Sequence, residues 1–147
     1  MKKVHKKIFN LEELKKKISV EKKKGKKIVL CHGVFDLLHV GHIKHFKSAK
    51  KSGDFLLVSI TSDQFVNKGP GRPVFNHNLR SEAISSLECV DAVFINNFQT
   101  PVNLIKLIKP NIYFKGPDYK DYKNDISGQI QKETAAIRKV GGKRFFT

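Results

Sequence analysis

Two histidines three positions apart, His39 and His42, lie at the start of a predicted helix that runs from about Gly41 to Lys51. Side chains at positions i and i+3 share one face of a helix, so both imidazoles are expected to point into the same pocket. The N-terminus of a helix also presents backbone N–H groups and the positive end of the helix dipole. Together these groups predict a site prepared for phosphate oxygens.

Two glycines accompany the histidines, and we expect each to serve the same pocket. Gly33 lets the backbone come close to a ligand, and Gly41 lets the helix begin tight against it. The stretch from His32 to His42 is neither a GxxxxGK[ST] phosphate loop nor a GxGxxG fingerprint. The sequence therefore lacks the motifs typical of Walker-type kinases and of ordinary dehydrogenases, and both classes are disfavoured.

Strands and helices alternate along the whole chain. The apolar patterns predict strands over 27–30, 55–60, 92–95, 112–115 and 143–146, and helices over 11–24, 41–51, 79–87, 102–108 and 127–140. This alternation predicts a three-layer α/β fold with a five-stranded parallel sheet and right-handed crossovers. In such sheets the ligand site lies beyond the carboxyl ends of the strands, at a switch in strand order, and the two histidines follow the first strand.

Length and composition set the broad class. The 147 residues fit one domain spanning 1–147. Cys31 and Cys89 lie 58 positions apart with no CxxC pair, which excludes a disulfide scaffold and favours a reducing cytoplasm. No apolar run approaches the roughly 18 to 20 residues of a membrane span, so no membrane partner is expected.

The formal charge of +16 comes mostly from lysine, with 25 Lys and 4 Arg. Twelve of the lysines precede Ile28, in and beside a lysine-rich helical segment over residues 1–26. Arginine is the better partner for phosphates and base edges, so a solvated lysine surface is favoured over a nucleic-acid or membrane-surface patch. In either case the positive field should concentrate anionic small molecules near the protein.

The pattern G-x-F-D-x-x-H-x-G-H over residues 33–42 resembles the signature of the HxGH nucleotidyltransferase superfamily, and especially its cytidylyltransferase-like branch. The resemblance implies a Rossmann-like, HUP-type fold. It also implies that His39 and His42 contact a nucleoside triphosphate and stabilise the charge of the transfer, with no covalent enzyme intermediate. The residues that it places around the nucleotide here are Gly33, Val34, Phe35, Asp36 and Gly41.

Three later stretches extend the resemblance. The family's K-G-x-x-R-P-V loop matches residues 67–74 and gives Lys68 a catalytic contact with the phosphates. Its next helix start matches residues 78–82 and gives Arg80 a phosphate contact. Its K-G-x-D-Y element matches residues 114–119 and brings Lys115, Gly116 and Asp118 to the nucleotide. The simpler alternatives are a surface lysine, a helix-surface arginine and a turn-forming aspartate.

The last of these elements is most similar to the heptose 1-phosphate adenylyltransferase half of bifunctional ADP-heptose synthases. The predicted function is therefore transfer of a nucleoside monophosphate from a triphosphate to a sugar phosphate, with release of pyrophosphate. A cytidylyltransferase acting on glycerol 3-phosphate or another phosphoalcohol is the alternative, although that family tends to carry Trp where this chain has Tyr119. An alternative of another class is a non-catalytic nucleotide- or nucleic-acid-binding domain.

The expected partners follow from this reaction. They are ATP or CTP, a phosphorylated sugar or alcohol, and Mg²⁺ carried in by the triphosphate, with Asp36 as a further oxygen ligand. A sugar kinase, fused or separate, and a second copy of the chain are further expected partners. Family members continue into an S/T-rich segment beyond the position of Thr147, so a truncated carboxyl end is expected. A metal site built from His32, His39, His42 and His45 is the alternative, although it lacks a Cys or carboxylate set.

Overall fold

The computed structural model describes residues 6–66, 69–116 and 128–146. Helices and strands alternate along the described chain as the sequence predicts. Their bounds are α1 Leu11–Lys23, β1 Ile28–Gly33, α2 Val40–Lys51, β2 Phe55–Thr61, α3 His77–Ser85, β3 Ala92–Asn96, α4 Val102–Ile108, β4 Ile112–Lys115, α5 Gln129–Lys139 and β5 Lys143–Phe146. A short 3-10 helix spans Asp63–Phe65. The five strands form one parallel sheet in the order β3-β2-β1-β4-β5.

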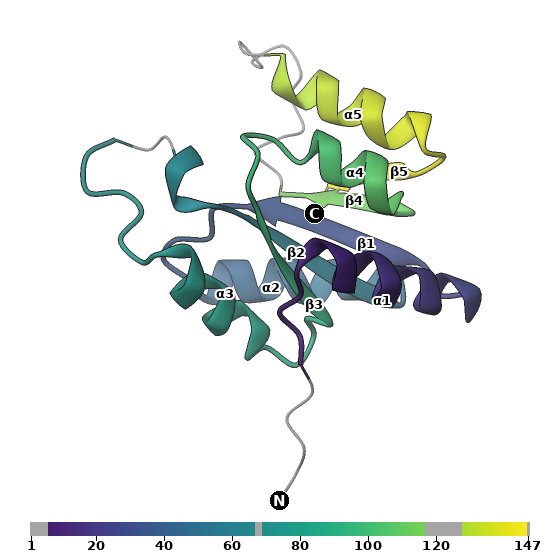
Figure 1. Cartoon of the computed structure of the whole chain (residues 1–147), viewed down its shortest axis with the longest axis horizontal. Coiled ribbons are helices and arrows are strands. Elements are labelled where there is room, and N and C mark those ends of the chain that lie inside the picture. The colour runs from purple at the N-terminus through teal and green to yellow at the C-terminus, as the bar shows by residue number, and fades with distance from the viewer. Residues whose placement is uncertain (1–5, 67–68, 117–127, 147) are drawn as a thin grey trace, which may run out of the picture.

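The sheet lies between two helical layers, which gives the predicted three-layer, Rossmann-like fold (Figure 1). Helices α1, α4 and α5 pack on one face, in a core that includes Leu14, Leu104 and Ile137. Helices α2 and α3 cover the other face through Phe46 and Ile84. Strand β2 is buried along its whole length, as a strand covered on both faces must be.

The strand order places the predicted site. From β1 the chain moves to β2 and β3 on one side, and it then returns to β4 and β5 on the other side. Strand β1 thus has β2 and β4 as its two neighbours, and the order reverses between β1 and β4. The segment 33–42 leaves the carboxyl end of β1 at this switch, which is where open α/β sheets bind their ligands.

Most element boundaries lie within two or three residues of the sequence-based ones. Helix α3 begins at His77 rather than at Leu79, because the Asn76 side chain accepts the Leu79 N–H and caps the helix there. Strand β1 continues to Gly33, beyond the predicted Leu30. Within the described ranges, no helix combines the length and the apolar character needed to cross a bilayer.

Candidate active site

The two histidines at the start of α2 form its N-terminal cap. His39 is the N-cap residue, and its Nδ1 accepts a hydrogen bond from the Gly41 N–H at 3.0 Å. The Nδ1 of His42 accepts the His39 N–H at 3.2 Å. The two rings lie face to face at a tilt, with 4.0 Å between their centroids. The sequence therefore brings both imidazoles together, as predicted from their spacing.

These hydrogen bonds fix the chemistry of the two rings. A neutral imidazole carries its proton on one nitrogen only, and a nitrogen that accepts an N–H is the unprotonated one. With Nδ1 of both His39 and His42 accepting backbone N–H groups, the protons lie on Nε2. Each ring thus carries an Nε2–H group, and groups of this kind suit the oxygens of a phosphate chain.

Glycine is needed at positions 33 and 41 for a different reason from the expected approach of a ligand. A Cβ on Gly41 would lie 2.7 Å from Cε1 of His39, so residue 41 leaves room for the capping ring rather than for a ligand. A Cβ on Gly33 would lie 2.8 Å from Cζ of Phe35. In the structure both glycines accommodate side chains of the segment itself.

Phe35 packs against the histidine pair through its contact with His42. Its backbone has a positive φ of 50°, which turns the chain sharply after β1. Its ring packs edge-on against His42, with 5.6 Å between centroids, and against Phe46, with 5.0 Å. Val34, the preceding residue, contributes its backbone carbonyl to Arg80. Phe35 therefore positions His42 by ring packing, and Val34 anchors the segment through its bond to Arg80.

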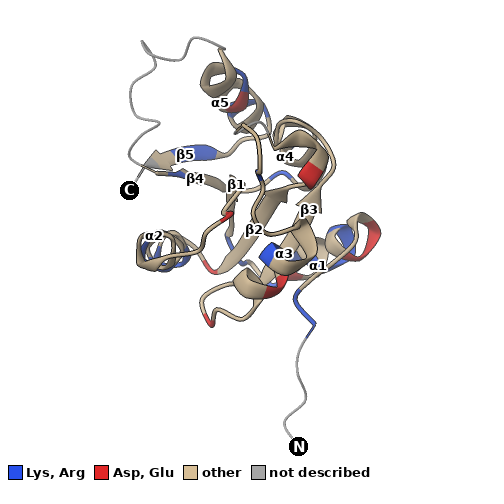
Figure 2. Cartoon of the chain, turned by 90° about the vertical axis from the view of Figure 1, so that its left-hand side faces the viewer, with Lys and Arg blue, Asp and Glu red and all other residues tan. Residues whose placement is uncertain are grey.

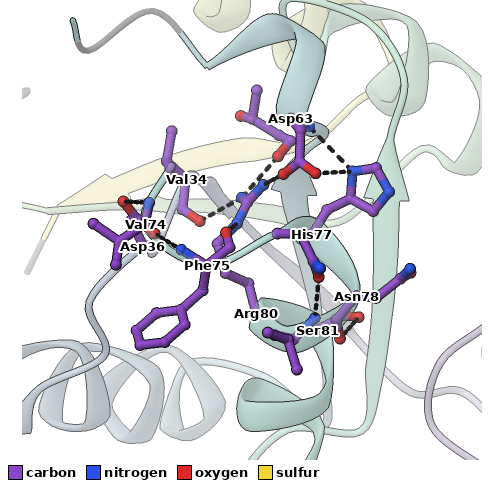
Figure 3. Close-up of polar contacts among 12 residues, drawn as sticks. Val34, Asp36, Asp63, Val74, Phe75, His77, Asn78, Arg80 and Ser81 are labelled. Atoms are coloured by element: carbon purple, nitrogen blue, oxygen red, sulfur yellow. Dashed lines mark hydrogen bonds and ion pairs between the residues drawn. The ribbon is translucent and has the colours of Figure 1, made fainter. Parts of the chain in front are cut away.

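Asp36 ties the first-strand segment to the loop that precedes α3. Its Oδ2 accepts the Val74 N–H at 2.8 Å and a guanidinium N–H of Arg72 at 3.1 Å, and its Oδ1 accepts the Phe75 N–H at 3.0 Å (Figure 3). Burial alone would raise the pKa of this carboxyl, but these three donors hold it below its usual value. Both oxygens are engaged, so the carboxylate does not fit the metal-ligand role expected for it.

Arg80 is a buried cation that protein groups hold in place, and its expected phosphate contact stays a prediction. Its side chain is 1% exposed, and its Nε donates to the Phe75 carbonyl at 2.9 Å. Its Nη1 donates to the carbonyls of Val34 and Thr61, and its Nη2 forms an ion pair with Asp63 at 2.7 Å (Figure 3). The guanidinium thus ties together the ends of β1 and β2 and the loop before α3.

Asp63 and His77 extend this cluster, and the sequence analysis missed both. The His77 Nδ1 accepts the Asp63 N–H at 3.1 Å, while the Asp63 carboxylate receives Arg80. Asp63 comes two residues after the end of β2. A polar residue just beyond the carboxyl end of a buried strand is a candidate site residue, and this position could have identified Asp63 from the sequence. The cluster fixes the start of α3 against the strand ends.

Lys115 at the end of β4 is also held by protein groups, and its expected contact with nucleotide stays a prediction. Its side chain is 7% exposed and forms an ion pair with Glu133 of α5 at 3.1 Å. Its ammonium also lies 4.9 Å from the centre of the Tyr113 ring, whose hydroxyl donates to the same carboxylate. Gly116 follows at the carboxyl end of the sheet, with no heavy atom within 4 Å of a Cβ built there.

Two predicted site residues, Lys68 and Asp118, lie outside the described residues. The four-histidine metal alternative fails, because the described part of the chain contains no group of three or more His, Cys, Asp or Glu side chains able to hold a metal ion. His32 instead contacts Ser59 through Nδ1 at 2.9 Å. Burial, together with the charge of Lys115, lowers the pKa of His32 to about 3, so this ring is neutral.

A small cavity of about 290 Å³ adjoins the site on the side of α3. Its walls are mainly apolar, and the polar side chains among its lining residues are Asp36 and Arg80, both of which are bonded to the protein. The lining residues are Phe35, Asp36, Leu38, Phe75, Leu79, Arg80 and Ala83. Both polar side chains of this cavity are thus committed to protein partners.

The fold and the histidine-capped helix at its switch point define a class, the Rossmann-like nucleotidyltransferases. A solved lipopolysaccharide core biosynthesis protein from Thermoplasma volcanium GSS1 is similar, with a TM-score of 0.69 and 31% identity over 83% of this chain and 96% of that one. Pantoate-beta-alanine ligase from Francisella tularensis shares the fold alone, with a TM-score of 0.60 and 16% identity over 97% of this chain and 67% of that one.

The family model described as cytidylyltransferase-like matches residues 30–144. The chain belongs to this family, and with it to the nucleotidyltransferase enzymes. Among curated relatives, Bifunctional protein HldE from Aliarcobacter butzleri is 42% identical over 139 residues, covering 92% of this chain and 29% of the relative. The protein of the same name from Nitratiruptor sp. is 45% identical over 123 residues, covering 82% and 26%. The chain thus spans less than a third of the length of these relatives.

Proposed function

We propose that this chain transfers the adenylyl group of ATP to a sugar 1-phosphate of the heptose type and releases pyrophosphate. The observation that carries the proposal is the pairing of His39 and His42, which cap the start of α2 through Nδ1 and have 4.0 Å between their ring centroids. The similarity to curated proteins named HldE over most of the chain supports the choice of acceptor and nucleotide.

The two histidines supply electrostatic stabilisation. In the reaction a phosphate oxygen of the acceptor forms a bond to the α-phosphorus, and the bond from that phosphorus to the β-phosphate bridging oxygen breaks. The electron pair of the broken bond leaves with pyrophosphate. Negative charge grows on the phosphate oxygens as this happens, and preorganised N–H donors stabilise it without prior rearrangement. The dipole of α2 acts in the same direction.

Asp36 and Arg80 act as positioning residues in this mechanism. Asp36 holds the backbone N–H groups of Val74 and Phe75, and Arg80 holds the Phe75 and Val34 carbonyls. The loop that enters α3 is therefore fixed against the segment that carries the histidines. We retain Lys68, at the other end of this loop, and Asp118 as proposed contacts of the triphosphate and of the nucleoside.

Mg²⁺ is proposed as part of the nucleotide substrate. Asp36 is already bonded to three donors, and a hard cation favours free oxygen ligands. We therefore propose that the phosphates themselves hold the ion, and no step here requires a protein ligand to it. A sugar kinase as partner, a homodimer and a cytoplasmic location remain predictions from the sequence.

The test is pyrophosphate release in the presence of Mg²⁺, crossing ATP and CTP with heptose 1-phosphate and glycerol 3-phosphate. The proposal predicts release only when ATP and heptose 1-phosphate are combined. Release with CTP and glycerol 3-phosphate would overturn it in favour of the alternative that the cytidylyltransferase-like family description supports. Nucleotide binding without release from any pair would also contradict it.

A further inference from the structure

The face of the sheet opposite to α2 and α3 carries a groove between α1 and α4. Figure 2 shows α1, α4 and α5 together on this side. The groove has a volume of about 430 Å³ and is lined by four lysines, Lys15, Lys22, Lys23 and Lys109, above the apolar residues Ile18 and Leu107. We call this feature the lysine groove. Neither the histidine site nor the proposed reaction uses it.

The lysine groove holds like charges close together. Lys109 has a left-handed backbone with φ of 50°, which ends α4 before the chain enters β4. The Lys22 ammonium donates to the Lys109 carbonyl at 2.5 Å. Burial, with the positive charge of Lys109, lowers the pKa of Lys22. Among the described residues that line the groove, none is acidic, so a bound anionic group would relieve the repulsion.

A second groove on the other side of α4 continues the same charge. It lies between α4 and α5, has a volume of about 530 Å³ and is lined by Lys106, Lys132 and Lys139. Its described lining residues also include no carboxylate. Positive charge therefore extends across the face on both sides of α4, which favours an extended partner over a small ion.

We propose that the lysine groove docks an acidic amphipathic helix of a partner protein. Leu107 is 44% exposed and supplies most of the apolar surface of the groove, because Ile18 and Ile108 are 3% and 4% exposed. It offers burial to apolar side chains, which a nucleic acid lacks, and a groove between helices is a common receptor for the apolar face of a helix. The charged residues of the lining are all lysine, whereas phosphate and base recognition favours arginine.

The experiment uses the full chain and a labelled peptide of about 16 residues, roughly four helical turns, with leucine at i, i+3, i+4 and i+7 and glutamate at most other positions. A scrambled peptide of the same composition carries the charge without the apolar face. A single-stranded DNA oligonucleotide of similar charge is the third probe. Fluorescence anisotropy gives the Kd of each probe at increasing salt.

The variant that tests the groove is Lys15→Glu with Lys23→Glu. Its matched control on the opposite layer is Lys44→Glu with Lys51→Glu, because each pair combines one exposed residue inside a helix with the last residue of that helix. Both variants lower the net charge by the same amount. Thermal unfolding of each variant shows whether the fold is kept.

The proposal expects the ordered peptide to bind at least about tenfold more tightly than the scrambled one. It expects the groove variant to lose about tenfold or more in affinity, and the control variant to lose about threefold or less. Equal losses in the two folded variants would show a general charge effect and overturn the proposal. Tighter binding of DNA than of the ordered peptide would overturn it as well, in favour of a nucleic-acid surface.

Discussion

The histidine pair and the Asp36–Arg80 cluster are neighbours in the fold, but they use their polar atoms in opposite ways. His39 and His42 each use Nδ1 to cap α2 and carry their proton on Nε2. Asp36 and Arg80 are 6% and 1% exposed in their side chains, and they are bonded to the surrounding backbone and to Arg72 and Asp63. The proposal therefore assigns the histidines to the ligand, and it assigns the Asp36–Arg80 cluster to holding the surrounding backbone in place.

Arg80→Leu should give the largest effect, on folding rather than on chemistry. The change leaves the Asp63 carboxylate and three backbone carbonyls without their donor. A buried acceptor that loses its donor costs about 1–3 kcal/mol, whereas Asp63 is 35% exposed and can regain water. We expect a loss of about 3 kcal/mol in the free energy of unfolding, measured by urea denaturation. Arg138→Leu, at an exposed position in α5, is the control and should change it by about 0.5 kcal/mol or less. Similar losses in both variants would contradict the role assigned to Arg80.

His42→Ala should act on chemistry. Removing one preorganised donor costs about a hundredfold or more in turnover, roughly 2.7 kcal/mol, whereas loss of its capping contact costs about 1 kcal/mol of stability. Pyrophosphate release and thermal unfolding measure the two effects separately. His45→Ala, one helical turn further along α2, is the control and should keep most of the turnover. An unchanged rate in the His42 variant would remove this histidine from the mechanism.

Asp36→Asn should loosen the loop before α3 without removing it. An amide presents one acceptor oxygen to the donors that two carboxylate oxygens now receive. We expect a loss of about 1–2 kcal/mol in the free energy of unfolding. Hydrogen exchange at the amides of Val74 and Phe75 should become faster. Unaltered exchange at both amides would show that Asp36 does not hold the loop.

A pH dependence of stability should come from His32. The unfolded chain takes up a proton at His32 near its ordinary pKa of about 6.5, whereas the folded chain does so only near about 3. Stability from this group is therefore complete above pH 6.5 and is lost as the pH falls, by up to about 1.4 kcal/mol per pH unit. Unfolding free energies between pH 6.5 and 4.5 should show this slope, and His32→Asn should flatten it. An equal slope in the two proteins would contradict the prediction.

The sequence predicted the elements and the histidine pair, because both depend on local spacing. The periods of the apolar residues define each strand and helix. The two rings meet because His39 is the N-cap of α2 and His42 is its third residue, so that each Nδ1 accepts a nearby backbone N–H. The switch point also followed from general rules for parallel sheets. The confirmed part of the prediction is thus the part that nearby residues determine.

The surroundings of Arg80 and Lys115 could not be predicted in this way. An arginine near a helix start has the same sequence signature whether it faces solvent or the strand ends, and its partners here lie between 5 and 46 positions away. For Lys115 a signal existed, because the preceding apolar residues of β4 indicate a strand buried on both faces. Its partner Glu133 depends on how α5 packs, which the local pattern does not determine.

The most direct test of the division between the two groups is His39→Asn. Asparagine is a good N-cap residue, so α2 should keep its start and the free energy of unfolding should change by about 0.5 kcal/mol or less. The Nε2–H donor is lost, so pyrophosphate release from ATP and heptose 1-phosphate should fall about a hundredfold or more. A folded His39→Asn protein that retains the rate of the original chain would contradict the central claim that this imidazole donates to the phosphates.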